Sequence, residues 1–124
     1  MSVPLHFVAP PLGFSELVDF SLNDVEGADG LYALRADSDA GVRLYVIDAA
    51  VHLPQYLPVI SDEQSATIGL TSSEDASVLV VVNPAEDGTT VNLLAPIVIN
   101  TTTGSTNQFI LEDNTWSVRE PLRA

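Results

Sequence analysis

Short runs of apolar and β-branched residues, separated by clusters of turn-forming residues, repeat along the whole chain. Runs of this length between Gly, Pro, Asn, Asp and Ser are typical of β-strands. The runs that we expect to form strands are 3–8, 17–22, 31–36, 42–48, 78–82, 89–94, 97–100 and 108–111. Many short strands with one short helix predict an all-β fold, either an antiparallel sandwich or a barrel. The 124 residues fit a single domain, 1–124.

The residues of some runs also predict where the strand lies in the sheet. Pro4 suits an edge position, because proline has no N–H to donate to a neighbouring strand. The run 78–82 is continuous, bulky and β-branched, which predicts a central strand buried on both faces. The polar residues 37–41 predict a hairpin loop between 31–36 and 42–48.

The dipeptide Ala95-Pro96 interrupts the apolar residues of the C-terminal half. A proline there predicts a bulge or a strand that changes sheets. Asn92 and Asn100 flank the break, and their side chains are suited to cap the freed backbone groups. We therefore expect Ala95 and Pro96 to act as a structural motif.

Residues 61–70 form the best candidate for a helix. Ser61 and Gln64 have the spacing of a capping box, and Gly69 is suited to end the helix. Thr71 and Glu74 predict one further turn.

Acidic residues dominate the charge of the chain. Seventeen Asp and Glu face four basic residues, all arginine, for a net charge of −13 and a pI near 4.1. Such a surface repels nucleic acid and anionic lipid. A strong negative field favours a basic protein as partner, although acidity that serves solubility alone is equally compatible with these counts.

Several kinds of chemistry are excluded or left without support. With no cysteine there is no disulfide or thiolate site, and residues 1–11 lack the basic start of a signal peptide. His52 lies four residues after Asp48, but the segment reads as a strand end and loop, so we expect no shared site with His6 or Asp48. Residues 37–41 start like a calcium loop, but Ile47 stands where the bidentate Glu is needed. We expect no metal, no cofactor and no enzyme activity.

One stretch of the sequence resembles the motif of a known protein family. Residues 92–100 read NLLAPIVIN, which resembles the N-L-x-A-P-I-V-I-N segment of the FliW family. Further pieces follow in the family's order: LGF at 12–14, Asp48-Ala49, LPQY at 53–56, and Asp113 followed by REPL at 119–122. The resemblance spans nearly the whole chain.

The resemblance implies a compact, antiparallel, β-barrel-like fold and a cytoplasmic protein. We expect the protein to be monomeric when free. It also implies binding to CsrA, a small basic regulator of translation, and to flagellin, so that flagellin level is coupled to flagellin synthesis. The alternative is a cytoplasmic chaperone that only holds unassembled flagellin. The motifs make Phe14, Tyr56, Asn92 and Asn100 the predicted partner-binding residues. Phe14, Tyr56 and Trp116 are also compatible with roles as lids of the core.

Overall fold

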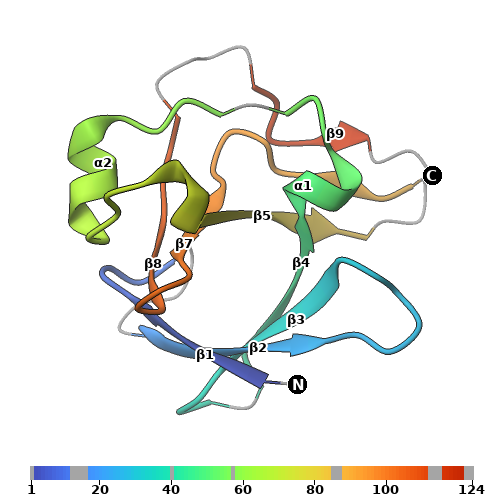
Figure 1. Ribbon diagram of the computed structural model, residues 1–124. Coiled ribbons are helices and arrows are strands. Elements are labelled where there is room, and N and C mark those ends of the chain that lie inside the picture. Colours follow the sequence, from blue (N-terminus) through green and yellow to red (C-terminus); the bar gives the residue numbers. More distant parts are fainter. Residues whose placement is uncertain are drawn as a thin grey trace.

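Seven strands close into a barrel. The computed structural model describes residues 2–11, 17–39, 41–56, 58–84, 88–111 and 116–121. The barrel strands are β1 (Ser2–Phe7), β2 (Asp19–Asp24), β3 (Leu31–Ala36), β4 (Arg43–Asp48), β5 (Ala76–Asn83), β7 (Ile97–Asn100) and β8 (Ser105–Gln108). They neighbour one another in the order β4-β3-β2-β1-β8-β7-β5, and a pairing of β4 with β5 completes the ring in Figure 1. The predicted all-β, barrel-like fold is confirmed.

Among the described residues, the strand pairings within the barrel are antiparallel with one exception. β1 runs parallel to β8, through the pairs His6↔Ser105 and Phe7↔Thr106. Pro4 lies before the part of β1 that pairs with β8, so the missing N–H of the proline removes no hydrogen bond between these two strands. Two short strands, β6 (Thr90–Val91) and β9 (Glu120–Pro121), extend the sheet beyond β5.

The interior of the barrel is filled by inward-facing side chains. The interior cluster comprises Leu5, Phe7, Phe20, Leu34, Ala36, Val46, Leu79, Ile97 and Ile99. At its centre the rings of Phe7 and Phe20 meet edge to face, with centroids 5.2 Å apart. Because side chains alternate along a strand, the neighbours of these residues point to the outside of the barrel.

On one side of the barrel the outward-facing residues are also buried. Ile47, Ala49, Tyr56, Val80, Val91 and Leu93 form what we call the Tyr56 cluster. Ile68, Val98 and Phe109 form the Phe109 cluster. In β5, Leu79 faces the interior and Val80 the outside, and both are at most 1% exposed. The prediction that 78–82 is a central strand buried on both faces is confirmed at these two residues.

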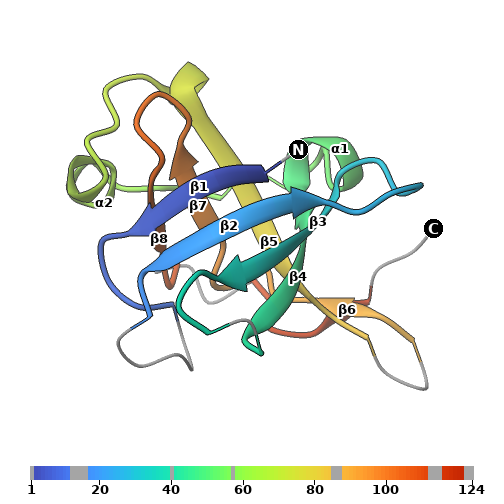
Figure 2. The ribbon, with the colours of Figure 1, turned by 90° about the horizontal axis from the view of Figure 1, so that it is seen from below.

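A layer without strands covers that side. It consists of residues 49–56 and 58–72, which we call the cover. The cover contains α1 (Ala49–His52) and α2 (Asp62–Thr67), and η1 (Ser73–Asp75) leads from it into β5. In Figure 1 the cover passes above β5, whereas Figure 2 brings β1, β2 and β3 to the front with no described helix over them.

The helix prediction for 61–70 was right in its start and somewhat long. Ser61 Oγ accepts from Gln64 N at 3.0 Å and Gln64 Oε1 accepts from Ser61 N at 3.0 Å, so the capping box forms. The helix ends at Thr67, and Gly69 follows with φ +67°, a conformation that favours glycine. The further turn predicted near Thr71 and Glu74 is η1.

Three expectations need correction. The strand predicted at 108–111 lies earlier in the chain, as β8 (Ser105–Gln108), and residues 109–111 belong to no strand. Residues 49–52 were predicted as strand end and loop, but they form α1, because the Asp48 carboxylate accepts from Ala50 N at 2.9 Å and caps a turn of helix. The chain thus has more than the one short helix expected. The strand predicted at 89–94 shortens to β6, because the chain leaves the ladder after Asn92. Among the described residues, no helix is long and apolar enough to cross a membrane.

Candidate partner interface

The segment around Ala95-Pro96 forms a corner beside β5. Between the pairs Val82↔Val91 and Leu79↔Ile97, β5 advances three residues while its partner advances six. The three extra residues leave the ladder as a bulge, which is one of the two forms expected from the sequence. Ala95 is 3% exposed, and Pro96 is fully buried.

Every backbone polar group of 93–96 has a partner within the protein. Leu93 N donates to Ser117 O, and the N–H groups of Leu94 and Ala95 donate to Asn92 Oδ1 at 3.1 and 3.2 Å. The four carbonyls accept, in chain order, from Tyr56 Oη, Leu111 N, Gln108 Nε2 and Phe109 N. Position 96 is proline, which has no N–H to satisfy. This complete pairing supports the structural interpretation of Ala95 and Pro96.

Asn100 holds the cover rather than the corner. Its Nδ2 donates to the carbonyls of Ile68 at 3.0 Å and Gly69 at 3.2 Å, just after α2, and its Oδ1 accepts from Thr102 N at 3.0 Å. The side chain is 3% exposed. The expectation that it caps backbone groups is met, but at the end of α2 and in the β7–β8 turn. This burial does not favour direct contact with a partner.

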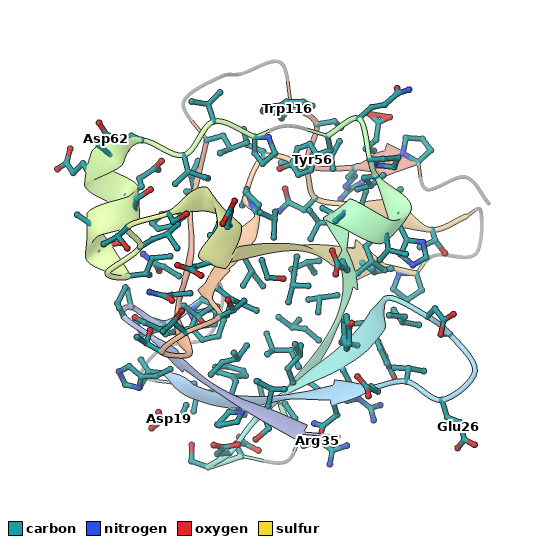
Figure 3. The ribbon with its side chains drawn as sticks, viewed as in Figure 1. Asp19, Glu26, Arg35, Tyr56, Asp62 and Trp116 are labelled. Atoms are coloured by element: carbon teal, nitrogen blue, oxygen red, sulfur yellow. The ribbon has the colours of Figure 1, made fainter. Side chains whose placement is uncertain are left out.

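Tyr56 closes the Tyr56 cluster from outside. Its ring meets that of Trp116 edge to face at 4.8 Å, its hydroxyl donates to Leu93 O at 2.5 Å, and it is 8% exposed. Burial raises the pKa of the Tyr56 phenol well above its usual range. This placement, visible at the top of Figure 3, supports the lid alternative for Tyr56 and Trp116.

The remaining predicted residue, Phe14, lies outside the described residues, as do 12–13, Asp113 and Arg123. Asn92 is half-buried and its side chain serves the corner. The structure therefore does not bring Phe14, Tyr56, Asn92 and Asn100 together as one exposed site. Their partner-binding role stays a prediction.

The histidines and the hairpin loop show no shared site. His6 Nδ1 lies 2.8 Å from Asp19 Oδ1 on the neighbouring strand, and His52 Nε2 lies 2.9 Å from Asp29 O. In the hairpin loop, Asp39 Oδ1 accepts from Gly41 N at 3.1 Å, as in a polar turn. Within the described ranges no cluster of three or more His or acidic residues is placed to hold a metal ion.

An open groove lies between the cover and the outer face of β5. Its volume is about 910 Å³. The apolar residues that line it are Ala49, Ala50, Leu53, Pro54, Tyr56, Pro58, Ile60, Leu70, Ala76, Val78 and Val98. The polar ones are Asp48, Asp62, Ser65, Thr71, Ser72 and Ser77. Val78 packs against both the Tyr56 cluster and the Phe109 cluster, so the groove lies where these two clusters meet.

Sequence reasoning missed this groove. The signal available was the density of apolar residues in 49–60, a segment without strand periodicity that still carries Leu53, Tyr56 and Ile60. Such a segment must pack on something, and here it packs on the outside of the sheet.

Two of the arginines lie together on neighbouring strands. Arg35 and Arg43, two of the three described arginines, are paired across β3 and β4. Figure 3 places Arg35 at the bottom of the view and Asp62, Tyr56 and Trp116 at the top. None of the described residues that line the groove is basic.

Several carboxylates lie near Tyr32, at the end of the barrel beside α1. Burial raises the pKa of Tyr32, and the nearby carboxylates of Asp48, Asp24 and Asp29 raise it further. Three carboxylates acting on one phenol indicate a negative potential at this end, next to the Asp48 rim of the groove.

Comparison with known proteins decides the family. A sequence profile described as "FliW protein" matches residues 2–122. The chain belongs to the FliW family. The flagellar assembly factor FliW of Leptospira biflexa is 33% identical over 121 residues, covering 95% of this chain and 79% of that protein. The flagellar assembly factor FliW of Symbiobacterium thermophilum is 33% identical over 119 residues, with 94% and 86% covered.

A solved structure agrees with the fold. The crystal structure of the flagellar assembly factor FliW superposes with a TM-score of 0.89 at 25% identity, covering 98% of this chain and 86% of the other. The resemblance of the chain to the FliW family is thus confirmed. Residues 92–100, which carried that resemblance, include the corner and Asn100, which holds the cover.

Proposed function

We propose that this protein is a flagellar assembly factor that binds a CsrA-type regulator of translation and flagellin. It acts in the cytoplasm, by binding rather than by catalysis, and couples flagellin level to flagellin synthesis. The observation that carries the proposal is the family match over residues 2–122, together with relatives named flagellar assembly factors.

The charge of the chain supports a basic partner. A net charge of −13 creates a long-range field that attracts a positively charged protein and steers it on approach. The acidic end near Tyr32 and the acidic rim of the groove place part of this charge beside apolar surface. Long-range attraction there supports fast association, and apolar contact supports affinity.

The test is direct binding with purified proteins. The chain is immobilised, and CsrA and flagellin from the source organism are passed over it separately and in sequence. We expect both to bind, and we expect flagellin to release CsrA. Binding of flagellin alone would support the chaperone alternative, and binding of neither protein would contradict the proposal.

Salt dependence separates steering from solubility. The Debye length falls from about 10 Å at 0.1 M to about 3 Å at 1 M, so the association rate with CsrA should fall clearly across this range. A rate that does not change with salt would show that the acidic surface serves solubility only.

A further inference from the structure

The groove between the cover and β5 combines apolar surface with a rim of one charge sign. We propose that it docks one apolar segment of the basic protein partner, with lysine or arginine residues of that segment lying against Asp48 at one end of the groove and Asp62 at the other. The inference rests on the proposed function, and it assigns the groove to the basic regulator rather than to flagellin.

The floor of the groove argues for an apolar ligand. β5 is buried on both faces at Leu79 and Val80, but Ala76 and Val78, which line the groove, remain half-buried. Val78 packs against both outer clusters, and the cover does not close over it. Removing this remaining apolar surface from water favours association with an apolar segment.

The rim argues for a basic group on that segment. The charged residues that line the groove are Asp48, at the cap of α1, and Asp62, at the start of α2. Arg35 and Arg43 lie together on β3 and β4, and Figure 3 places Arg35 on the side of the barrel away from Asp62. Basic residues of the partner would therefore meet a carboxylate at each end of the groove, and no described residue of the lining is an arginine that would compete.

The polar groups argue against a small molecule as the occupant. Small-molecule sites present a few polar groups that converge inside a largely enclosed pocket. Here the groove is partly open, none of the four Ser and Thr residues that line it is buried, and Thr71 and Ser72 are exposed. An extended or helical protein segment fits an open groove of this composition better.

The first experiment fills the groove. Ser65 lines it from α2, whereas its neighbour Ala66 is exposed on the same helix and does not line it. Ser65→Phe should weaken binding of purified CsrA by about tenfold or more, because the added ring occupies the docking site. Ala66→Phe adds the same ring outside the groove and should change the affinity by less than about twofold.

The second experiment removes the charge. The double variant D48N/D62N keeps a capping oxygen at position 48, because Asn caps helices as well as Asp does. It should weaken CsrA binding by about tenfold at 0.1 M salt and flatten the salt dependence. E26Q/E63Q removes the same charge from exposed residues that do not line the groove, and it should change the affinity by less than about twofold.

The outcomes separate the two proposals. Thermal unfolding of each variant within a few degrees of the wild type shows that the fold is intact. If the wild type binds neither CsrA nor flagellin, the proposed function fails. If the wild type binds CsrA and the groove variants bind it equally well, the groove assignment alone is overturned. Loss of flagellin binding with CsrA binding retained overturns it as well, because flagellin would then occupy the groove.

Discussion

The two sides of the barrel are built on different sequence patterns. β1 buries Leu5 and Phe7 and exposes His6 between them, so its residues alternate. β7 buries all four of its residues, Ile97–Asn100, because the interior lies on one side and the cover on the other. A continuous apolar strand therefore indicates that a second layer packs on the outside of the barrel. The strand's sequence does not indicate which segment of the chain forms that layer.

The two sides should also differ in how they fail. The uncovered side depends on the barrel interior, so damage there should unfold the whole protein. The covered side depends in addition on contacts between the cover and the sheet, so damage to those contacts should open the cover locally before the barrel unfolds.

Phe20→Ala tests the interior and should have the largest effect. Phe20 is fully buried and packs edge to face on Phe7. We expect its truncation to lower the free energy of unfolding by about 3 to 5 kcal/mol, measured by urea denaturation. A loss below about 1 kcal/mol would contradict the interior packing described above.

Asn100→Ala tests the attachment of the cover. The change removes the donor to the Ile68 and Gly69 carbonyls and the acceptor for Thr102 N. We expect a loss of about 2 kcal/mol, because the buried Ile68 carbonyl and two partly buried backbone groups lose their partner. Hydrogen exchange should become faster in α2 than in β1 and β2. Equal acceleration in all three elements would show that the cover and the barrel open together.

Alkaline pH tests the other end of the cover. Because the pKa of Tyr56 is raised in the folded state, the neutral phenol stabilises the protein fully below pH about 10, and this stabilisation falls as the pH rises further. Between the pKa of the unfolded state and that of the folded state, the phenol is neutral only in the folded protein. In this range the free energy of unfolding falls by up to about 1.4 kcal/mol per pH unit.

Tyr56→Phe isolates this contribution. At neutral pH it should cost about 1 kcal/mol, because Leu93 O loses its donor while the ring still packs on Trp116. The urea midpoints at pH 9 and pH 11 should then differ less for the variant than for the wild type. The pH dependence that remains in the variant comes from Tyr32, whose pKa is also raised. Identical pH dependence in the two proteins would contradict the buried position of Tyr56.

Ser61→Ala should have the smallest effect. It removes the oxygen that accepts from Gln64 N and leaves one donor of α2 without its cap. We expect a loss of about 0.5 to 1 kcal/mol, again seen mainly as faster exchange in α2. Ser61→Asp is the matched control, because Asp caps a helix as well as Ser does and should restore the exchange rate.

The strands and α2 could be predicted because their causes are local. The alternation of 31–36, the continuous run at 78–82 and the Ser61–Gln64 capping box each depend on a few neighbouring residues. α1 was missed because its formation depends on a single carboxylate, that of Asp48, at the end of a strand. No periodicity marks a helix of one turn.

The candidate site was less predictable because it depends on long-range contacts. Asn100 bonds to carbonyls that lie 31 and 32 positions earlier in the chain, and the Tyr56 hydroxyl bonds to a carbonyl 37 positions later. Neither pairing leaves a trace in the spacing of residues. The family motif located both asparagines and the tyrosine, but their burial and partners come from the folded arrangement.

The parallel pairing of β1 with β8 has a consequence for synthesis. His6 and Ser105 are neighbours in the sheet but are 99 positions apart in the chain. At about 5 to 20 residues per second, translation takes roughly 5 to 20 s to deliver β8 after β1 has been made. During that interval β1 can pair with β2 but keeps an open edge, so the nascent chain is exposed to wrong strand pairing until its barrel closes.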